Sequence, residues 1–349
     1  MKSLIRIDGS YGEGGGQLLR SSLALSVVTG KEVEINNIRA NRPKPGLKPQ
    51  HHAVVSLLKK LSAAETEGLY LGSRTVRFKP HQVDGGLFQF DVGTAGSVVL
   101  ILETCLLLGL TAKTALSIRI RGGTDVAWSP PWDFFSQVFL RSIRMMDIKM
   151  KEELHQRGYY PKGGGEATLH IQPIDRIKAF CGETGVSHQK VRGRIHVANL
   201  PDHIGSRMKH AAIKTCTAED LSAHIKTEFL SSASAGTGIT LWMYDDSSVL
   251  GVSHLGRKGV PAERIGEDAA KDMIRQYRAQ VSVDEYLFDQ ILPFMVFADD
   301  DSICRVQKLS SHAKTNLWLI KQFVSREYYS ISKKKNCYEV RIKGMHNML

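Results

Sequence analysis

The sequence predicts an α/β protein made of repeated βαβαββ units, with a smaller α/β domain inserted late in the chain. Three segments share one plan, in which a strand-like stretch enters a glycine turn and continues into an apolar helix; they begin at Ser3, Phe88 and Ser117. The residue pattern changes after about Gly185 and returns near Gln280. We therefore expect one domain of residues 1–184 and 281–349 and an inserted α/β domain of residues 185–280.

The first segment shows the predicted unit most clearly. One buried helical face is predicted by Leu18, Leu19, Leu23, Leu25 and Val27, and Gly30 stands where that helix should stop. A second helix is expected from about Gln50 to Leu61, and strand-like stretches follow at residues 68–72 and 75–80. Strand, helix, strand, helix and two strands give the order βαβαββ.

The inserted domain and the C-terminal part have their own signals. Within residues 185–280 we expect a strand at 191–200, a long helix at about 213–229, a glycine-serine linker at 231–238, a pair of strands and a helix at 263–277. Beyond them, helices are predicted at 284–297 and from about His312, before a final strand at 338–342.

Composition narrows the class of protein. Of the 349 residues, 42% are hydrophobic and 23% charged, and no run approaches the roughly 20 apolar residues that span a bilayer. The first residues lack the pattern of a signal peptide, so no targeting segment is expected. Five scattered cysteines form no CxxC pair, which disfavours both a disulfide framework and a cysteine zinc site. These features predict a cytoplasmic protein.

The chain is strongly basic, with 47 Lys and Arg against 35 Asp and Glu and a formal charge of +12. Such an excess favours a polyanionic partner, because cations that neutralise phosphates release counterions. It is equally compatible with a surface that only keeps the protein soluble.

A glycine loop, Gly12 to Gly16, precedes the first predicted helix, with Arg20 one turn inside it. Glycines let backbone N–H groups approach an anion at a helix N-terminus, although a plain tight turn explains the same residues. Glu13 is unsuited to binding an anion alone. It fits a site in which a divalent cation lies between its carboxylate and phosphate oxygens.

A basic loop follows at residues 38–51, stiffened by three prolines. It carries Arg39, Arg42, Lys44 and Lys48. The planar guanidinium groups suit bidentate phosphate contacts, and the prolines reduce the entropy lost on holding them in place. This pattern predicts a phosphate or RNA clamp, and the alternative is a solvated basic loop.

His312 lies in the segment LSSHAKTN at the start of a predicted helix. Ser311 is the expected N-cap, and the positive end of the helix together with Lys314 favours the uncharged imidazole. Such a ring is a competent nucleophile and its position would stabilise a phosphoramidate, although a lone histidine at a helix start is often only structural. The sequence has neither a P-loop nor a GxGxxG fingerprint, so any ATP must bind in another manner.

Assembled in order, these motifs resemble the RNA 3′-terminal phosphate cyclases over nearly the whole chain. The resemblance lies in DGSYGEGGGQLLR, IRANRPKPGLKPQH, DVGTAGS, GGTDV, LPDHIGSR, GVPAERIGEDAA, VDEYLFDQILPFM and SSHAKTN. The signature of that family, with its three glycines, matches residues 157–167 except that Ala167 replaces Leu, Ile or Val. Glu103 stands where relatives often have Gln.

The resemblance implies βαβαββ units similar to the C-terminal domain of translation initiation factor 3. It also implies the ATP-dependent conversion of an RNA 3′-terminal phosphate to a 2′,3′-cyclic phosphodiester, through a covalent His312–AMP and an RNA(3′)pp(5′)A intermediate. Glu13 would hold Mg²⁺ or Mn²⁺. Phosphates would lie among Arg20, Arg39, Arg42 and Gln50, and the nucleotide pocket would comprise Glu103, Pro131, Tyr286, Asp289, Gln290 and His312.

The expected partner is an RNA with a 3′-terminal phosphate, without a membrane or an obligate protein partner. One alternative is a non-catalytic, cyclase-like RNA-binding protein of ribosome assembly, a class that lacks the histidine. Another is an enolpyruvyl transferase, which resembles the cyclases in its repeats but uses no ATP.

Overall fold

The computed structural model describes residues 4–324 and 326–345, and its N-terminal part is a four-stranded sheet with two helices. Its elements are β1 (Ile5–Asp8), α1 (Gly16–Thr29), β2 (Val33–Asn36), α2 (Pro49–Leu61), β3 (Glu65–Glu67) and β4 (Val76–Lys79). The sheet has the order β1-β2-β4-β3, with β1 and β2 parallel and the other pairs antiparallel. The strand predicted at residues 68–72 is wrong: Gly68 and Gly72 have φ of +72° and +82°, and this left-handed backbone makes a turn.

A second sheet repeats these strand directions. Its elements are β5 (Gly86–Asp91), α3 (Val98–Gly109), β6 (Leu116–Gly122), α4 (Trp132–Phe134), the π-helical η1 (Phe135–Phe139), α5 (Leu140–Met145), β7 (Met150–Gln156) and β8 (Gly165–Ile171). The strand order is β5-β6-β8-β7, again with one parallel pair followed by two antiparallel pairs.

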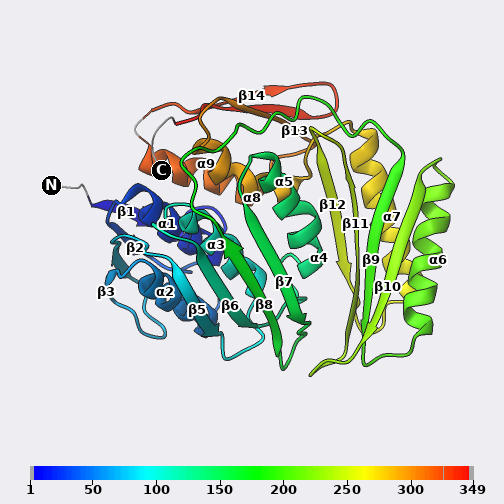
Figure 1. Cartoon of the computed structure of the whole chain (residues 1–349), viewed down its shortest axis with the longest axis horizontal. Coiled ribbons are helices and arrows are strands. Elements are labelled where there is room, and N and C mark those ends of the chain that lie inside the picture. Colours follow the sequence, from blue (N-terminus) through cyan, green and yellow to red (C-terminus); the bar gives the residue numbers. More distant parts are fainter. Residues whose placement is uncertain (1–3, 325, 346–349) are drawn as a thin grey trace.

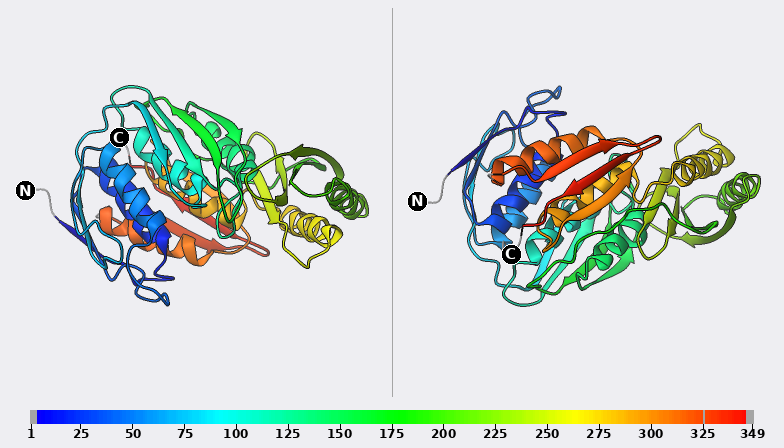
Figure 2. Two further views of the ribbon diagram at one scale, coloured as in Figure 1. Left: turned by 90° about the horizontal axis from the view of Figure 1, so that it is seen from below. Right: turned by 90° about the horizontal axis from the view of Figure 1, so that it is seen from above.

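The C-terminal part contributes a third sheet. It comprises α8 (Glu285–Val296), β13 (Ser302–Val306), α9 (Ser311–Phe323), β14 (Tyr329–Lys333) and β15 (Tyr338–Ile342), with the strand order β13-β15-β14. Cys181 forms a parallel bridge with Ile303 of β13, so the chain near residue 181 takes the place that β1 has in the first sheet. Figure 2 shows the three sheets on the outside of the main body with helices packed between them.

The segment between Cys181 and α8 forms a separate sheet of its own. Its elements are β9 (Lys190–Ala198), α6 (His203–Thr217), β10 (Ser222–Leu230), β11 (Gly236–Tyr244), β12 (Val249–Leu255) and α7 (Ala262–Arg278), with the strand order β10-β9-β11-β12. This sheet lies between the main body and its two helices (Figure 1). The helix predicted at 213–229 is wrong, because it ends at Thr217 and residues 222–230 alternate in burial and pair in parallel with β9.

Buried apolar side chains fall into two clusters. The larger lies in the main body, and the smaller joins α6 and α7 to the sheet of residues 190–255. Trp242 of β11 belongs to the larger cluster, and Gly251 of β12 lies where a Cβ would be only 2.6 Å from Val138 of the main body. No helix among the described residues is long and apolar enough to cross a membrane.

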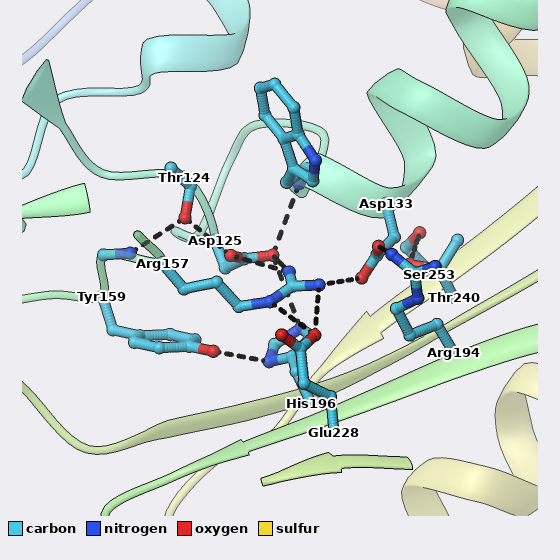
Figure 3. Close-up of polar contacts among 12 residues, drawn as sticks. Thr124, Asp125, Asp133, Arg157, Tyr159, Arg194, His196, Glu228, Thr240 and Ser253 are labelled. Carbon is cyan, nitrogen blue, oxygen red and sulfur yellow. Dashed lines mark hydrogen bonds and ion pairs between the residues drawn. The ribbon is translucent and has the colours of Figure 1, made fainter. Parts of the chain in front are cut away.

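A buried polar network, centred on Arg157, joins the main body to the sheet of residues 190–255 (Figure 3). The Arg157 guanidinium lies 3.2 Å from Asp125 and 2.8 Å from Asp133 in the main body, and 3.1 Å from Glu228 of β10. Burial disfavours the charged guanidinium, but these three carboxylates together raise the pKa of Arg157. The ion pairs therefore fix the position of β10 relative to the main body.

A hydrogen-bonded chain runs beside these ion pairs. His196 of β9 has its Nδ1 2.8 Å from the Tyr159 hydroxyl and its Nε2 3.4 Å from Asp125. Burial lowers the pKa of His196, which favours the neutral ring. A neutral ring satisfies both contacts when the Tyr159 hydroxyl donates to Nδ1 and Nε2–H faces the carboxylate.

We predict that Arg157→Ala lowers the free energy of unfolding by about 3–5 kcal/mol, because it leaves Asp125 buried without an arginine and Asp133 paired with Arg194 alone. Urea denaturation measures this change. The control is Arg207→Ala, which breaks an ion pair whose two side chains are about half exposed and should cost no more than about 1 kcal/mol. Equal losses in the two variants would contradict the role given to the network.

Candidate active site

Three loops leave the same end of the first sheet. β1 and β2 run parallel and end at Asp8 and Asn36, while β4 begins at Val76 opposite Ile35. In the structure the glycine loop covers residues 9–15, because Gly16 already begins α1, and the basic loop covers residues 37–48, because α2 begins at Pro49. These two loops and the Tyr70 turn (residues 68–75) therefore lie at the carboxyl ends of the parallel strands. This edge of an α/β sheet is where ligands commonly bind.

Two glycines, Gly12 of the glycine loop and Gly16 at the start of α1, lie too close to their neighbours to carry a side chain. A Cβ on Gly12, whose φ is +63°, would lie 2.4 Å from the Thr315 hydroxyl of α9. A Cβ on Gly16 would lie 2.4 Å from His51 Nε2 in the first turn of α2. The N-terminal ends of α1, α2 and α9 are thereby brought together.

Two aromatic rings fix the loop against α9. Tyr11 stacks on Trp318 with ring centroids 3.8 Å apart and an interplanar angle of 13°. Asn41 of the basic loop donates to the Ser10 carbonyl at 2.9 Å from the other side. The glycine loop is therefore held between α9 and the basic loop.

His312 lies in the first turn of α9, as the sequence predicts. The predicted N-cap is wrong by one residue, because Ser310, and not Ser311, accepts the hydrogen bond from the Ala313 N–H at 2.9 Å. The His312 side chain is 46% exposed, and its Nε2 lies 3.2 Å from Glu13 Oε2. A histidine from the C-terminal part thus faces a carboxylate of the N-terminal glycine loop.

Asp289 of α8 lies on the other side of the imidazole. Its Oδ2 is 4.0 Å from His312 Nδ1 and accepts a hydrogen bond from Ser310 at 3.0 Å. Burial raises the pKa of Asp289 well above its ordinary value, and the nearby Glu103 and Asp284 raise it further. The same carboxyl group is therefore tied to the helix cap that positions His312.

Arg20 of α1 and Glu103 of α3 are buried close enough for their charges to interact. Burial raises the pKa of Glu103 to about 8, although the charge of Arg20 opposes this shift. Burial lowers the pKa of Arg20, and the negative charges of Glu103 and Asp289 partly offset this shift. Oε1 of Glu103 is buried without a hydrogen-bond partner among the described residues, so it is available to a ligand.

The basic loop brings its cations to the glycine loop. Arg42 lies 3.9 Å from Glu13. Arg39 donates to the carbonyls of Lys44 and Gly46 at 2.7 and 3.0 Å, so in this structure it also holds the loop in shape. Gln50 lies at the start of α2, beside Gly96 in the loop that precedes α3.

His51 is a site residue whose position the sequence did not reveal. It is buried in the first turn of α2, against Gly16, and its Nδ1 accepts a hydrogen bond from the Lys48 N–H at 3.3 Å. Burial lowers the pKa of His51 to about 3, and the charges of Arg20, Arg39 and Lys48 contribute to the shift. The ring is therefore neutral and adds no positive charge to the cluster of cations.

The predicted nucleotide residues are only partly brought together. Glu103, Asp289 and His312 lie near one another, and Gln290 Oε1 is buried without a partner in the described chain. Pro131 is the buried residue before α4, and Tyr286 is 59% exposed on α8. Within residues 4–324 and 326–345, no side-chain hydrogen bond, ion pair or aromatic stacking joins Pro131 or Tyr286 to His312.

Few side chains of the candidate site are placed to coordinate a metal cation. Across residues 4–324 and 326–345, no three His, Cys, Asp or Glu side chains gather as a metal site. Glu13 alone offers a half-exposed carboxylate between His312 and Arg42. A hard cation held there would take its other ligands from phosphate oxygens and water, as Mg²⁺ commonly does.

Converging helix N-termini, clustered cations and an accessible histidine are the features of an α/β protein whose site is suited to an anion. Comparison with known proteins identifies the family. The family model described as RNA 3′-terminal phosphate cyclase matches residues 11–329, and the chain belongs to that family.

Curated relatives named RNA 3′-terminal phosphate cyclase agree with this assignment. The relative from Pyrococcus furiosus is 41% identical over 325 residues, covering 93% of this chain and 94% of that protein. The relative from Archaeoglobus fulgidus is 42% identical over 327 residues, covering 93% and 96%. Among solved structures, EPSP synthase from Acinetobacter baumannii covers 95% of this chain and 65% of its own at 11% identity, but its TM-score of 0.30 is too low to support an inference.

We predict that Glu103→Gln stabilises the protein in a pH-dependent way. The folded-state pKa of about 8 lies above the unfolded value of about 4.3, so the stability contributed by Glu103 is complete below the unfolded pKa and is lost as the pH rises towards 8. Glutamine does not titrate, so the free energy of unfolding of the variant, minus that of the wild type, should grow by roughly 2–4 kcal/mol between pH 4.5 and 8.

Urea denaturation across this pH range tests the prediction. Thr104→Val, at the next position of α3, changes no ionisable group, so its effect on stability should not vary with pH. If the free energy of unfolding of Glu103→Gln differs from that of the wild type by the same amount from pH 5 to pH 9, the Glu103 carboxyl group is not held protonated.

Proposed function

We propose that this chain converts an RNA 3′-terminal phosphate to a 2′,3′-cyclic phosphodiester at the expense of ATP, through an adenylate carried on His312. The observation that carries the proposal is the half-exposed His312, 3.2 Å from Glu13, at the N-terminus of α9 and beside the glycine loop. The family and its named relatives support the substrate and the reaction.

In the first step His312 attacks the α-phosphorus of ATP. A proton on Nδ1, on the side of Asp289, leaves the Nε2 lone pair to form the N–P bond while the bond to pyrophosphate breaks. The helix N-termini and Arg20, Arg39 and Arg42 offset the charge on the phosphate oxygens, and Gln50 lies next to them. Glu103, Pro131, Tyr286, Asp289 and Gln290 are proposed to line the nucleotide pocket.

The next two steps transfer and release AMP. An oxygen of the RNA 3′-phosphate attacks the adenylate phosphorus, the bond to His312 breaks, and an RNA(3′)pp(5′)A anhydride forms. The vicinal 2′-hydroxyl then attacks the terminal phosphorus, loses its proton and expels AMP. Because this hydroxyl is adjacent, ring closure gains from proximity.

We propose that Glu13 holds Mg²⁺ or Mn²⁺ through its hard carboxylate oxygens. When bound, the cation would neutralise charge on the phosphates and support the departure of pyrophosphate. Glu13 faces both His312 and Arg42, so it lies between the nucleophile and a cation of the basic loop.

The architecture is proposed to follow the same family plan. Residues 1–184 and 281–349 would form a catalytic domain of βαβαββ units like the C-terminal domain of translation initiation factor 3, with residues 185–280 as the inserted domain. The two separate apolar clusters support this division. All five cysteines are free, which supports the cytoplasm as the compartment. The non-catalytic alternative is not favoured, because His312 is present and the similar curated proteins are named as cyclases.

We expect His312→Ala to abolish labelling of the protein by α-labelled ATP and a divalent cation, because the variant lacks the nucleophile. Wild type should carry an acid-labile label. The matched control is His203→Ala, which removes another exposed histidine at the first position of a helix, α6, and should leave labelling unchanged. Equal labelling of wild type and His312→Ala would refute the assignment.

Glu13→Gln should raise the concentration of Mg²⁺ or Mn²⁺ needed for half-maximal adenylation by about tenfold or more, since an amide is a weaker ligand than a carboxylate. Titration of each cation against labelling measures the shift. An unchanged cation dependence, with folding intact by circular dichroism, would exclude Glu13 as the ligand.

A further inference from the structure

The Tyr70 turn is joined to the basic loop by backbone hydrogen bonds. The N–H groups of Ile38 and Leu47 donate to the carbonyls of Arg74 and Ser73 at 3.0 and 2.9 Å, and the Gly72 N–H donates to the Leu47 carbonyl at 2.9 Å. A Cβ on Gly46 would lie 2.1 Å from the Gly72 carbonyl oxygen, so the two backbones are in direct contact. The turn is therefore held in a fixed position on the basic loop.

Contacts continue from this turn to the catalytic histidine. The basic loop is bound to the glycine loop through Asn41 and Ser10, and Arg42 lies 3.9 Å from Glu13. Glu13 in turn lies 3.2 Å from His312. A chain of contacts therefore links His312, through Glu13 and Arg42, to the basic loop and the Tyr70 turn.

Two large apolar side chains project from this turn into solvent. Tyr70 is 63% exposed and Leu71 is 61% exposed. Within residues 4–324 and 326–345, the Tyr70 ring stacks on no aromatic ring or cation, and its hydroxyl has no side-chain hydrogen bond. The fold of the chain therefore gives this ring no packing partner.

Beside Tyr70 is a cleft of about 520 Å³, within the size range of about 300–1,000 Å³ that suits small organic groups. Its two acidic residues are paired, Glu67 with Arg77 at 3.7 Å and Glu34 with Arg6 at 3.6 Å. Arg74 is exposed at the cleft and has no carboxylate within ion-pair distance in the described part of the chain. An exposed ring beside an uncompensated cation matches the chemistry of single-stranded nucleic acid, whose bases stack and whose phosphates are anionic.

We propose that Tyr70 is a stacking platform for a base upstream of the RNA 3′-terminal phosphate, and that Arg74 neutralises a backbone phosphate of the same strand. This inference rests on the proposed function for the identity of the strand. The terminal phosphate lies at the glycine and basic loops, and the preceding nucleotides follow the surface to the turn. Because every base has a π face, this subsite gives affinity without reading sequence.

The test measures the binding of a fluorescent hexaribonucleotide 3′-phosphate by anisotropy. Tyr70→Ala should weaken binding by about 5- to 100-fold, and Tyr70→Phe, which keeps the ring, should bind within about twofold of wild type. The matched control is Trp128→Ala, which removes the fully exposed ring of the β6–α4 loop and should leave binding unchanged. A Tyr70→Ala change below twofold, or a larger loss in Trp128→Ala, overturns the proposal.

Arg74→Gln tests the second half of the proposal independently. Removal of one phosphate contact should reduce the slope of log Kd against log salt concentration by about 0.7 for a single strand. Tyr70→Ala should weaken binding without changing that slope. If the slope is unchanged in Arg74→Gln, Arg74 does not contact a phosphate of the bound RNA.

Two readouts separate this proposal from the proposed function. Adenylation of His312 by ATP needs no RNA, so it should be normal in Tyr70→Ala and Arg74→Gln; its absence in wild type would refute the proposed function alone. A mononucleoside 3′-phosphate has no upstream base, so its affinity should not differ between wild type and Tyr70→Ala. If Tyr70→Ala loses the same factor of affinity for the mononucleotide and the hexanucleotide, the substitution distorts the whole site, and the proposal that Tyr70 is a stacking platform is overturned.

Discussion

The structure depends on the close approach of the glycine loop to two helices that belong to distant parts of the chain. Gly12 lies against Thr315 of α9, and Gly16 lies against His51 of α2, at distances that leave no room for a Cβ. A Cβ at Gly12 would push against Thr315 of α9, the helix that carries His312, and a Cβ at Gly16 would push against His51 of α2. The absence of a side chain at these two positions therefore allows His312, Glu13 and His51 to lie close together.

Gathering cations at such a place has an electrostatic cost, which the neutral groups of the site reduce. Burial and three neighbouring cations keep His51 uncharged, so it packs against the loop without adding to the repulsion. Burial also favours the protonated forms of Glu103 and Asp289. Glu13 lies beside Arg42, but the buried carboxyl groups add little negative charge to oppose the positive field of Arg20, Arg39 and the helix N-termini, which suits a polyphosphate ligand.

Local sequence patterns were sufficient for many elements and failed where the outcome depended on partners elsewhere. The helix predicted near 263–277 and the final strand at 338–342 are confirmed, because their periodicity is strong and local. The helix expected at about 213–229 is too long, since nothing in the sequence of its second half shows that β9 lies beside it as a parallel partner of β10. The Tyr70 turn was missed because its apolar residues resemble a strand unless the two glycines are given positive φ.

For the site, the sequence provided the glycine loop, the basic loop and His312 as separate motifs. It could not show that they meet, since Glu13 and His312 are 299 residues apart. The sequence does not single out His51 either, because its burial against Gly16 is a property of the assembled loops. The network around Arg157 was equally hidden, because its partners lie on the loop between β6 and α4, on α4 and on β10.

The position of the insertion within the third sheet affects how the protein is made. The backbone N–H of Phe180 donates a hydrogen bond to the hydroxyl of Ser302, 122 residues further along the chain. The segment between them has its own apolar cluster. Folding of that segment by itself would bring its two ends together and lower the entropy lost in closing so long a loop. His312 comes after this closure in the chain. A nascent polypeptide on the ribosome therefore cannot bring His312 to Glu13 until the whole of this segment and α9 have been synthesised.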